Sequence, residues 1–135
     1  MLVADTSVWI DLLKGNSTPQ SDFLRVNLEE RRADFALTDI VFTELLQGVR
    51  DDGQASKLEE RLSEFPVLRL EGLDDFRRAA GIHRAARRRG QAIRRTSDCL
   101  IASVCIRDEL PLLHSDADFD RIASVSELTI VGPLV

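Results

Sequence analysis

Short apolar runs, separated by stretches with helical periodicity, are the feature that most restricts the fold of this chain. The runs cover residues 2–4, 35–37, 66–70, 112–113 and 128–131. Most of them are apolar throughout, and such strands are typical of a parallel sheet that helices cover on both faces. We therefore expect a three-layer α/β/α sandwich with a short parallel sheet of four to five strands, built as a single domain over residues 1–135.

Capping residues mark where the intervening helices begin. Thr18 followed by Pro19, and Thr38 before an apolar segment, are typical starts of helices. The expected caps are Asp5-Thr6-Ser7, Thr18, Thr38 and Thr96-Ser97. The expected helices cover residues 8–13, 19–32, 40–49, 55–65, 73–89, 98–108 and 116–125.

Composition agrees with a compact domain that needs no disulfide. Hydrophobic residues make up 44% of the chain and charged residues 30%, a balance that argues against disorder. We expect the two cysteines, Cys99 and Cys105, to be small buried residues. No apolar run approaches the roughly 18 residues of a membrane span, and Asp5 comes too early for a signal peptide, so we expect a cytoplasmic protein with no membrane partner.

Acidic residues follow the expected strands. Asp5 follows the first strand, Asp39 follows the second and Asp116 follows the fourth, and the carboxyl ends of parallel strands meet at one edge of the sheet. Asp98 begins a helix, where a single carboxylate is also explained by the helix dipole. Glu44 lies on an otherwise apolar helix, so it is either a partly buried acid that needs a partner or a solvated residue beside the apolar face.

Four acids brought together with no basic residue among them would repel one another unless a cation were bound. Ligand sets made only of oxygen atoms favour Mg²⁺, with Mn²⁺ as a substitute, whereas the cysteines and histidines lack the spacing of zinc ligands. A cation held in this way polarises a phosphate and acidifies a bound water. The chemistry that this predicts is hydrolysis of phosphodiester bonds without a covalent intermediate.

Four motifs occur in register over essentially the whole chain: Asp5-Thr6-Ser7-Val8-Trp9-Ile10-Asp11, Thr43-Glu44-Leu45, Ser97-Asp98-Cys99-Leu100-Ile101-Ala102 and His114-Ser115-Asp116-Ala117-Asp118-Phe119. Together they resemble the motifs of PIN-domain ribonucleases of the VapC toxin family. The resemblance implies a PIN-like fold and an endoribonuclease whose metal-binding and catalytic acids are Asp5, Glu44, Asp98 and Asp116. It also implies an RNA substrate, inhibition by a cognate VapB-like antitoxin, and a homodimer.

The roles within this site are left partly open. We expect Asp5 and Asp98 to be direct ligands, and Glu44 and Asp116 to bind through water, orient the nucleophile or hold a second ion. Asp118 either supports the site or caps a helix. Thr6 and Ser7 either hydrogen-bond a carboxylate or phosphate or cap a helix, and capping is the favoured role for both.

Basic residues are concentrated in one segment of a chain whose net charge is −5. Eight of the 18 basic residues are arginines between Arg77 and Arg95. We expect Arg94 or Arg95, just before Asp98, to contact the RNA backbone, and we leave the helical arginines either as RNA contacts or as a solvated face. His83 is expected to be structural, and His114 to approach the site.

The sequence also leaves two alternative functions and one candidate binding surface. A phosphoryl-receiver domain shares an acidic Mg²⁺ pocket but needs a lysine at the end of a late strand, and neither Lys14 nor Lys57 is so placed. A catalytically silent PIN-like RNA-binding module is the other alternative. The helices over 40–49 and 55–65 carry many large aliphatic residues, which predicts either a groove between them for an antitoxin helix or packing within the protein or against a second copy.

Overall fold

The strands and helices alternate as expected. The computed structural model describes residues 1–134. The elements are β1 (Leu2–Ala4), α1 (Thr6–Lys14), α2 (Pro19–Glu29), β2 (Phe35–Thr38), α3 (Asp39–Gln47), α4 (Asp52–Leu62), β3 (Val67–Leu68), α5 (Gly72–Arg88), α6 (Thr96–Arg107), β4 (Leu112–Leu113) and α7 (Ala117–Ser124). None of these helices combines the length and the apolar character that crossing a membrane requires.

The sheet has four parallel strands in the order β3-β2-β1-β4. The inner strands β1 and β2 are almost entirely buried, because helices cover both of their faces. The fifth expected strand, over 128–131, is reduced to one parallel bridge between Ile130 and Leu112. The neighbouring strand β4 is only two residues long, so few backbone groups are available to pair with residues 128–131.

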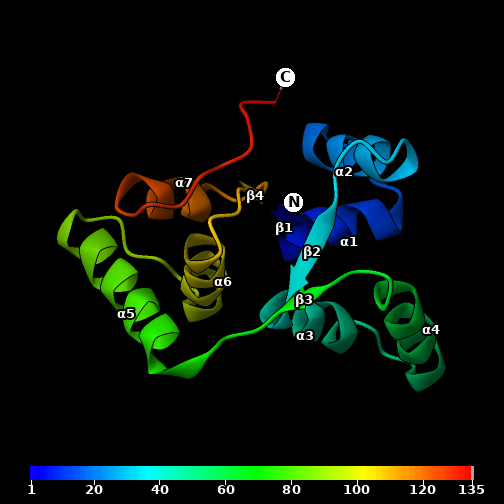
Figure 1. The fold of residues 1–135 in the computed structure, drawn as a ribbon, viewed down its shortest axis with the longest axis horizontal. Coiled ribbons are helices and arrows are strands. Elements are labelled where there is room, and N and C mark those ends of the chain that lie inside the picture. Colours follow the sequence, from blue (N-terminus) through cyan, green and yellow to red (C-terminus); the bar gives the residue numbers. More distant parts are fainter. Residues whose placement is uncertain (135) are drawn as a thin grey trace.

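The layers follow from this sheet. In Figure 1, α5, α6 and α7 lie on one side of the strands and α1, α2 and α4 on the other, while α3 packs against α1, α4 and α6. The core contains the sheet residues together with the inner faces of these helices. Cys99 and Cys105 are free and buried within it, as expected. The three-layer α/β/α prediction is confirmed.

Helix boundaries differ from the expected ones at a few positions. Arg95, without a side-chain bond, is the N-cap of α6, so the prediction that Thr96 and Ser97 cap this helix is wrong. The Asp98 amide already donates to the Arg95 carbonyl, which places Thr96 and Ser97 inside the first turn. Helix α4 ends at Leu62, and Phe65 beyond it packs edge-on against Trp9, with ring centroids 5.2 Å apart.

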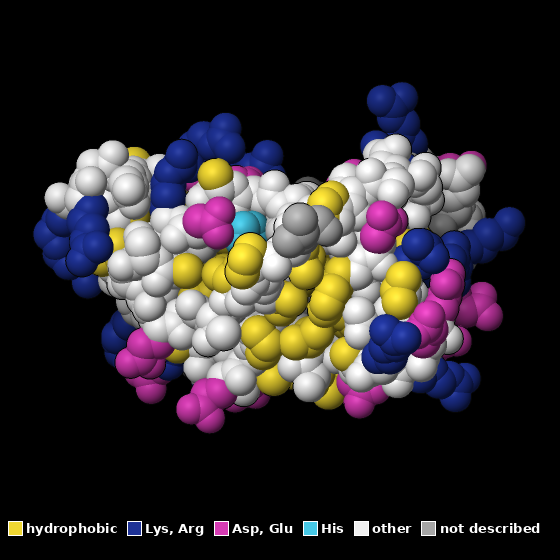
Figure 2. Space-filling model, turned by 90° about the horizontal axis from the view of Figure 1, so that it is seen from above, with side chains coloured by type: hydrophobic (Ala, Val, Ile, Leu, Met, Phe, Trp, Pro, Cys, Tyr) yellow, Lys and Arg dark blue, Asp and Glu magenta, His cyan; other side chains and the backbone are white. Residues whose placement is uncertain are grey.

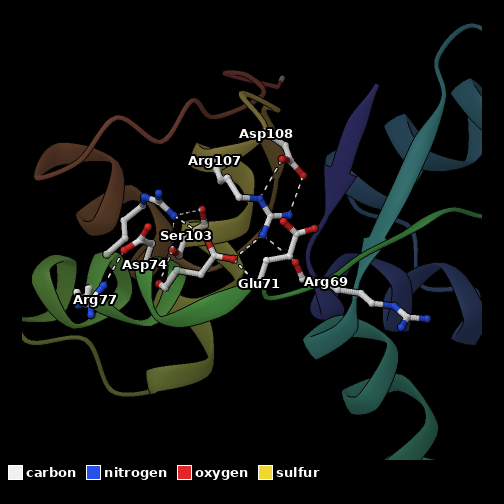
Figure 3. A network of polar contacts seen from close by, with 9 residues as sticks. Arg69, Glu71, Asp74, Arg77, Ser103, Arg107 and Asp108 are labelled. Carbon is white, nitrogen blue, oxygen red and sulfur yellow. Dashed lines mark hydrogen bonds and ion pairs between the residues drawn. The ribbon is translucent and has the colours of Figure 1, made fainter.

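A buried ionic network joins α5 to α6 (Figure 3). Asp75, only 1% exposed, forms ion pairs with Arg78 of α5 and Arg107 of α6. The Ser103 hydroxyl of α6 donates to the Asp75 carbonyl, 2.7 Å away, and the Glu71 amide donates to the Asp75 carboxylate, 2.7 Å away. These contacts fix the start of α5 against the helix that carries Asp98.

An apolar groove of about 410 Å³ opens on the side of the molecule opposite α5. It is lined by Trp9, Leu12 and Leu13 of α1, Arg25, Leu28 and Glu29 of α2, Leu58, Arg61 and Leu62 of α4, and Glu64 and Phe65. The groove expected between the 40–49 and 55–65 segments is therefore displaced: α1 and α2 take the place of α3. Helix α3 turns Val41 and Leu45 into the core instead.

Candidate active site

The first acid lies at the end of β1. Asp5 is buried and is the N-cap of α1. The Ser7 hydroxyl donates to Asp5 Oδ2 at 2.8 Å. Burial raises the pKa of Asp5 despite this hydrogen bond, and the negative charge of Glu44 acts in the same direction. A buried carboxylate of this kind is destabilised as an anion until a positive charge approaches it.

Glu44 has the partner that a partly buried acid needs. Thr6 Oγ1 donates to Glu44 Oε1 at 2.8 Å and so joins α1 to α3. The hydroxyls of Ser7 and Ser115 lie 3.0 Å apart and join α1 to the segment between β4 and α7. Capping was the favoured role for Thr6 and Ser7, but Asp5 caps the helix and both hydroxyls bind carboxylates instead.

The remaining acids meet at the starts of α6 and α7. Asp98 lies in the first turn of α6, and Asp116 is the N-cap of α7, where its carboxylate accepts from the Asp118 amide at 2.9 Å. One carboxylate oxygen from each of Asp98, Asp116 and Asp118 lies within 4.8 Å of the other two. The structure therefore brings Asp118 into the cluster as well.

Electrostatics links this cluster to the acids on β1 and α3. Burial, followed by the negative charges of Asp5 and Asp116, raises the pKa of Asp98 to about 7, and Glu44 adds to the rise. The four expected acids are thus close enough to act on one another. Their convergence follows from the parallel sheet, which brings the ends of β1 and β4 to one edge.

A divalent cation fits this set of residues. Asp98 Oδ2 is buried and accepts no hydrogen bond from any group among residues 1–134. A buried oxygen without a donor is costly, and a cation bound beside it would remove both this cost and the repulsion that raises the pKa of Asp98. All the candidate ligand atoms are oxygens, which favours Mg²⁺ or Mn²⁺ over zinc.

Arginines border the acidic cluster at Asp118, whereas none of the ion pairs of the described residues involves Asp5, Glu44, Asp98 or Asp116. Arg94 Nε lies 3.6 Å from Asp118 Oδ2, and Arg121 forms an ion pair with Asp118 Oδ1. Burial by itself would raise the pKa of Asp118, but the hydrogen bond from Arg121 and the charge of Arg94 together lower it. The charge of Arg95 acts on Asp98 and opposes the rise of its pKa.

Both histidines have structural partners. His114 Nδ1 accepts from the Asp116 amide at 3.1 Å, and its Nε2 lies 3.1 Å from Asp120 Oδ1. His114 therefore helps to hold the backbone that carries Asp116. His83 Nε2 lies 3.2 Å from the Ile93 carbonyl, in agreement with the expected structural role.

Arg121 is a residue of this site that the sequence analysis did not identify. Its spacing of three from Asp118 on one helix was a usable signal, because residues three apart on a helix are neighbours. The signal was weak, since Asp118 was itself assigned only as a supporting or capping residue. Burial of Asp118 makes the pair important, and a sequence does not show burial directly.

Known proteins are similar to this chain in sequence and in fold. The sequence profile of the PIN domain family matches residues 2–125. VapC ribonuclease Mb1587 of Mycobacterium bovis is 38% identical over 128 residues, which cover 95% of this chain and 96% of that protein. Ribonuclease VapC51 of Mycobacterium tuberculosis is 36% identical over 91 residues, covering 67% and 66% of the two chains.

Solved structures show the same fold. A chain of VapBC2 from Rickettsia felis, bound to a DNA fragment from its promoter, superposes with a TM-score of 0.74 at 20% identity, covering 96% of both chains. A chain of FitAcB from Neisseria gonorrhoeae superposes with a TM-score of 0.74 at 21% identity, covering 98% of both chains. From the profile match and the VapC relatives together, this chain belongs to the PIN domain family and, within it, to the VapC group.

Proposed function

We propose that this chain is a metal-dependent endoribonuclease that acts as the toxin of a toxin-antitoxin pair. The observation that carries the proposal is the convergence of Asp98, Asp116 and Asp118 within 4.8 Å, in an environment that raises the pKa of Asp98 to about 7. The names of the VapC ribonuclease relatives support RNA as the substrate. Membership of the PIN domain family excludes the receiver-domain alternative.

Asp5, Glu44, Asp98 and Asp116 would hold Mg²⁺, with Mn²⁺ as a substitute. The bound cation would supply Lewis acidity toward a phosphate oxygen and acidify a water molecule. Asp5 and Asp98, the two most buried of these acids, are the direct ligands. Glu44 and Asp116 complete the metal shell directly or through water.

Hydroxyl and imidazole groups of the chain hold these ligands in place. Ser7 orients Asp5, and Thr6 orients Glu44. His114 accepts from the Asp116 amide and so fixes the turn that carries this acid. Such outer contacts reduce the reorganisation that metal and substrate would otherwise require.

Arg94 and Arg95 would contact the RNA backbone. Arg94 is 76% exposed at the edge of the acidic cluster, and the charge of Arg95 reaches Asp98. Guanidinium groups bind phosphate oxygens through paired hydrogen bonds. These two residues would bring the RNA backbone toward a site that is otherwise strongly negative.

The apolar groove of α1, α2 and α4 would hold the antitoxin. Its lining is mainly aliphatic and aromatic, with charged residues at its border, which suits one face of an amphipathic helix. A basic side chain extended from the bound segment would compete with the metal for the carboxylates of the active site.

A nuclease assay tests the proposal. The wild-type chain should cleave single-stranded RNA in Mg²⁺ and lose this activity in EDTA, and Asp98→Asn should abolish cleavage. Asp74→Asn removes the same charge at an exposed position and should leave the rate unchanged. RNA binding without cleavage by the wild-type chain would instead identify a catalytically silent module.

A further inference from the structure

A cavity with two arginine side chains in its wall adjoins the acidic cluster. Its volume is about 720 Å³, and it is lined by the 90–94 segment between α5 and α6 and by the start of α7. Asp116 and Asp118 form its border with the acidic cluster, and Arg94 and Arg121 contribute guanidinium groups to its wall. The cavity is therefore continuous with the proposed active site and adds two guanidinium groups to it.

One buried carboxylate orients both arginines. Asp118 is 1% exposed, and its two oxygens face different partners, with Arg121 at Oδ1 and Arg94 at Oδ2. The arginine side chains themselves are 44% and 76% exposed. Each guanidinium carries five N–H donors, so both retain donors for a ligand in the cavity. Because Asp118 already fixes their position, a ligand would find them partly preorganised.

The guanidinium donors favour an anion here. Asp116 and Asp118 balance the two arginine charges in the wall of the cavity, but both guanidinium groups share the single carboxylate of Asp118, which leaves N–H donors for a further anion. Figure 2 shows that basic side chains also gather at the end of the molecule formed by α5 and α7. An RNA phosphate approaching the acids needs such a counter-charge, and arginine pairs match the geometry of phosphate oxygens.

We propose that Arg94 and Arg121, oriented by Asp118, form a subsite for an RNA backbone phosphate next to the scissile one. This inference rests on the proposed ribonuclease function and adds Arg121 and the cavity of the 90–94 segment to it. Asp118 is then a positioning residue that acts through the two arginines. The subsite would set where the strand lies relative to Asp98 and Asp116.

Binding measurements without metal test the subsite separately from catalysis. The probe is a fluorescein-labelled single-stranded RNA, titrated by fluorescence polarisation in EDTA over a series of NaCl concentrations. Arg121→Ala should weaken binding about tenfold and reduce the salt slope by about 0.7, the value for one lost single-strand phosphate contact. Arg121→Lys should recover part of the affinity, because it keeps the charge but not the guanidinium fork.

Two further variants control for charge and folding. Arg50→Ala removes the same charge from an exposed position between α3 and α4 and should leave the salt slope unchanged. Arg94→Ala alters a side chain that is 76% exposed, so it should keep the wild-type melting temperature and still weaken RNA binding. It serves in place of Arg121→Ala if that variant unfolds.

The outcomes separate the subsite from the proposed function. If Arg94→Ala and Arg121→Ala bind RNA like Arg50→Ala, or if the wild-type chain binds no RNA, the subsite is wrong. If the wild-type chain fails to cleave RNA in Mg²⁺ while the arginine variants lose binding, the subsite stands and the nuclease proposal fails. If the arginine variants lose affinity only for an acidic protein partner, the cavity belongs to a protein interface and the phosphate subsite is wrong.

Discussion

At the scale of single residues, the acids of this protein fall into two groups according to their neighbours. Asp118 and Asp75 are buried, but each contacts arginines that lower its pKa below the ordinary value. Asp5 and Asp98 are also buried but face other acids, and burial with like charges raises their pKa values. The charges of Asp118 and Asp75 are thus neutralised by arginines of the chain itself, whereas those of Asp5 and Asp98 would be stabilised by a bound cation.

The raised pKa of Asp98 predicts a stability that depends on pH in metal-free buffer. The folded state holds the Asp98 proton up to about pH 7, whereas the unfolded state loses it near 3.8. Stability should therefore fall as pH rises through this window. Asp98→Asn should remove this part of the fall. Urea unfolding of both proteins at several pH values measures it.

The fall in wild-type stability with rising pH should become smaller when Mg²⁺ is added, since the cation binds the ionised carboxylates of the wild-type protein. Asp74→Asn serves as the control with an exposed acid. Parallel pH curves for the wild-type protein and Asp98→Asn would show that Asp98 has an ordinary pKa and is not crowded by its neighbours.

The hydrogen bond between Thr6 and Glu44 predicts an effect on activity from outside the ligand set. Thr6→Val removes the hydroxyl donor at nearly constant volume and leaves Glu44 free to rotate. Supporting contacts of this type are worth roughly 10–100-fold in metal affinity or activity, so the cleavage rate should fall within that range. Thr6→Ser should retain most of the rate because it keeps the hydroxyl.

Thr43→Val is the matched control, because the Thr43 hydroxyl donates only to the Asp39 carbonyl of its own helix. Cleavage should be unaffected by this change. If Thr6→Val and Thr43→Val cleave RNA at the same rate, Glu44 does not depend on Thr6 for its orientation.

At the scale of secondary-structure elements, the contact between α5 and α6 determines where the catalytic helix lies. Asp75 in the first turns of α5 pairs with Arg107 at the far end of α6 from Asp98 (Figure 3). The rest of the interface is apolar, with Ala79, Ile82 and Ala86 turned inward from α5. The ionic network therefore fixes the alignment of two helices whose apolar contact alone is non-directional.

Breaking this network should cost more stability than any surface change nearby. Asp75→Asn would leave Arg78 and Arg107 without their buried counter-charge, and removal of one partner from a buried pair costs about 3–5 kcal/mol. Asp74→Asn changes the adjacent residue, whose side chain is 87% exposed, and should cost less than about 0.5 kcal/mol. Urea denaturation of the two variants provides the comparison.

The stabilisation by the Asp75 network depends on pH with the opposite sign to the contribution of Asp98. Burial opposes ionisation of Asp75, but the Glu71 amide and the two arginines outweigh it and lower its pKa. Its stabilisation is present above the ordinary value of 3.8 and is lost as pH falls through the lower, folded-state pKa. Equal stabilities of Asp75→Asn and Asp74→Asn would mean that the network contributes only to alignment.

At the scale of the whole molecule, catalysis and inhibition are proposed to use different surfaces. The acids and the arginine cavity lie where β1 and β4 meet α6 and α7, and the apolar groove lies among α1, α2 and α4. Helix α1 belongs to both, since it carries Thr6 and Ser7 at its start and Leu12 and Leu13 near its end. An antitoxin in the groove would thus bind next to the site through this helix.

The groove predicts that inhibition can be lost without loss of cleavage. Leu13 lines the groove and is 40% exposed, so Leu13→Glu should fold normally and place a charge where an apolar helix face would bind. Its RNA cleavage should match the wild-type rate, while inhibition by the cognate antitoxin should weaken at least tenfold. Cleavage assays with increasing antitoxin, together with calorimetric titration, measure both effects.

Ser56→Glu provides the control, because Ser56 is exposed on α4 and does not line the groove. It should leave inhibition intact. Full inhibition of Leu13→Glu as well would place the antitoxin on another surface.

Four strands, most helix boundaries and the acids at the strand ends could be predicted from the sequence, whereas the expected fifth strand over 128–131 is only a single bridge. These features depend on local physics: apolar runs need burial, and Thr18 and Thr38 cap helices through bonds to residues three positions away. The parallel sheet then requires Asp5 and Asp116 to share an edge. The motif resemblance added the catalytic assignment of Glu44 and Asp98, which their positions on helices had left open.

Which side chains meet across long stretches of chain is visible only in the folded structure. Thr6 contacts Glu44 from 38 residues away, and Arg107 reaches Asp75 from 32 residues away. The groove includes α1 and α2 instead of α3 because packing against the sheet fixes which face each helix leaves exposed. Local patterns show which residues prefer to be buried, but the pKa of a carboxylate and the partner of an arginine depend on neighbours that only the folded chain brings together.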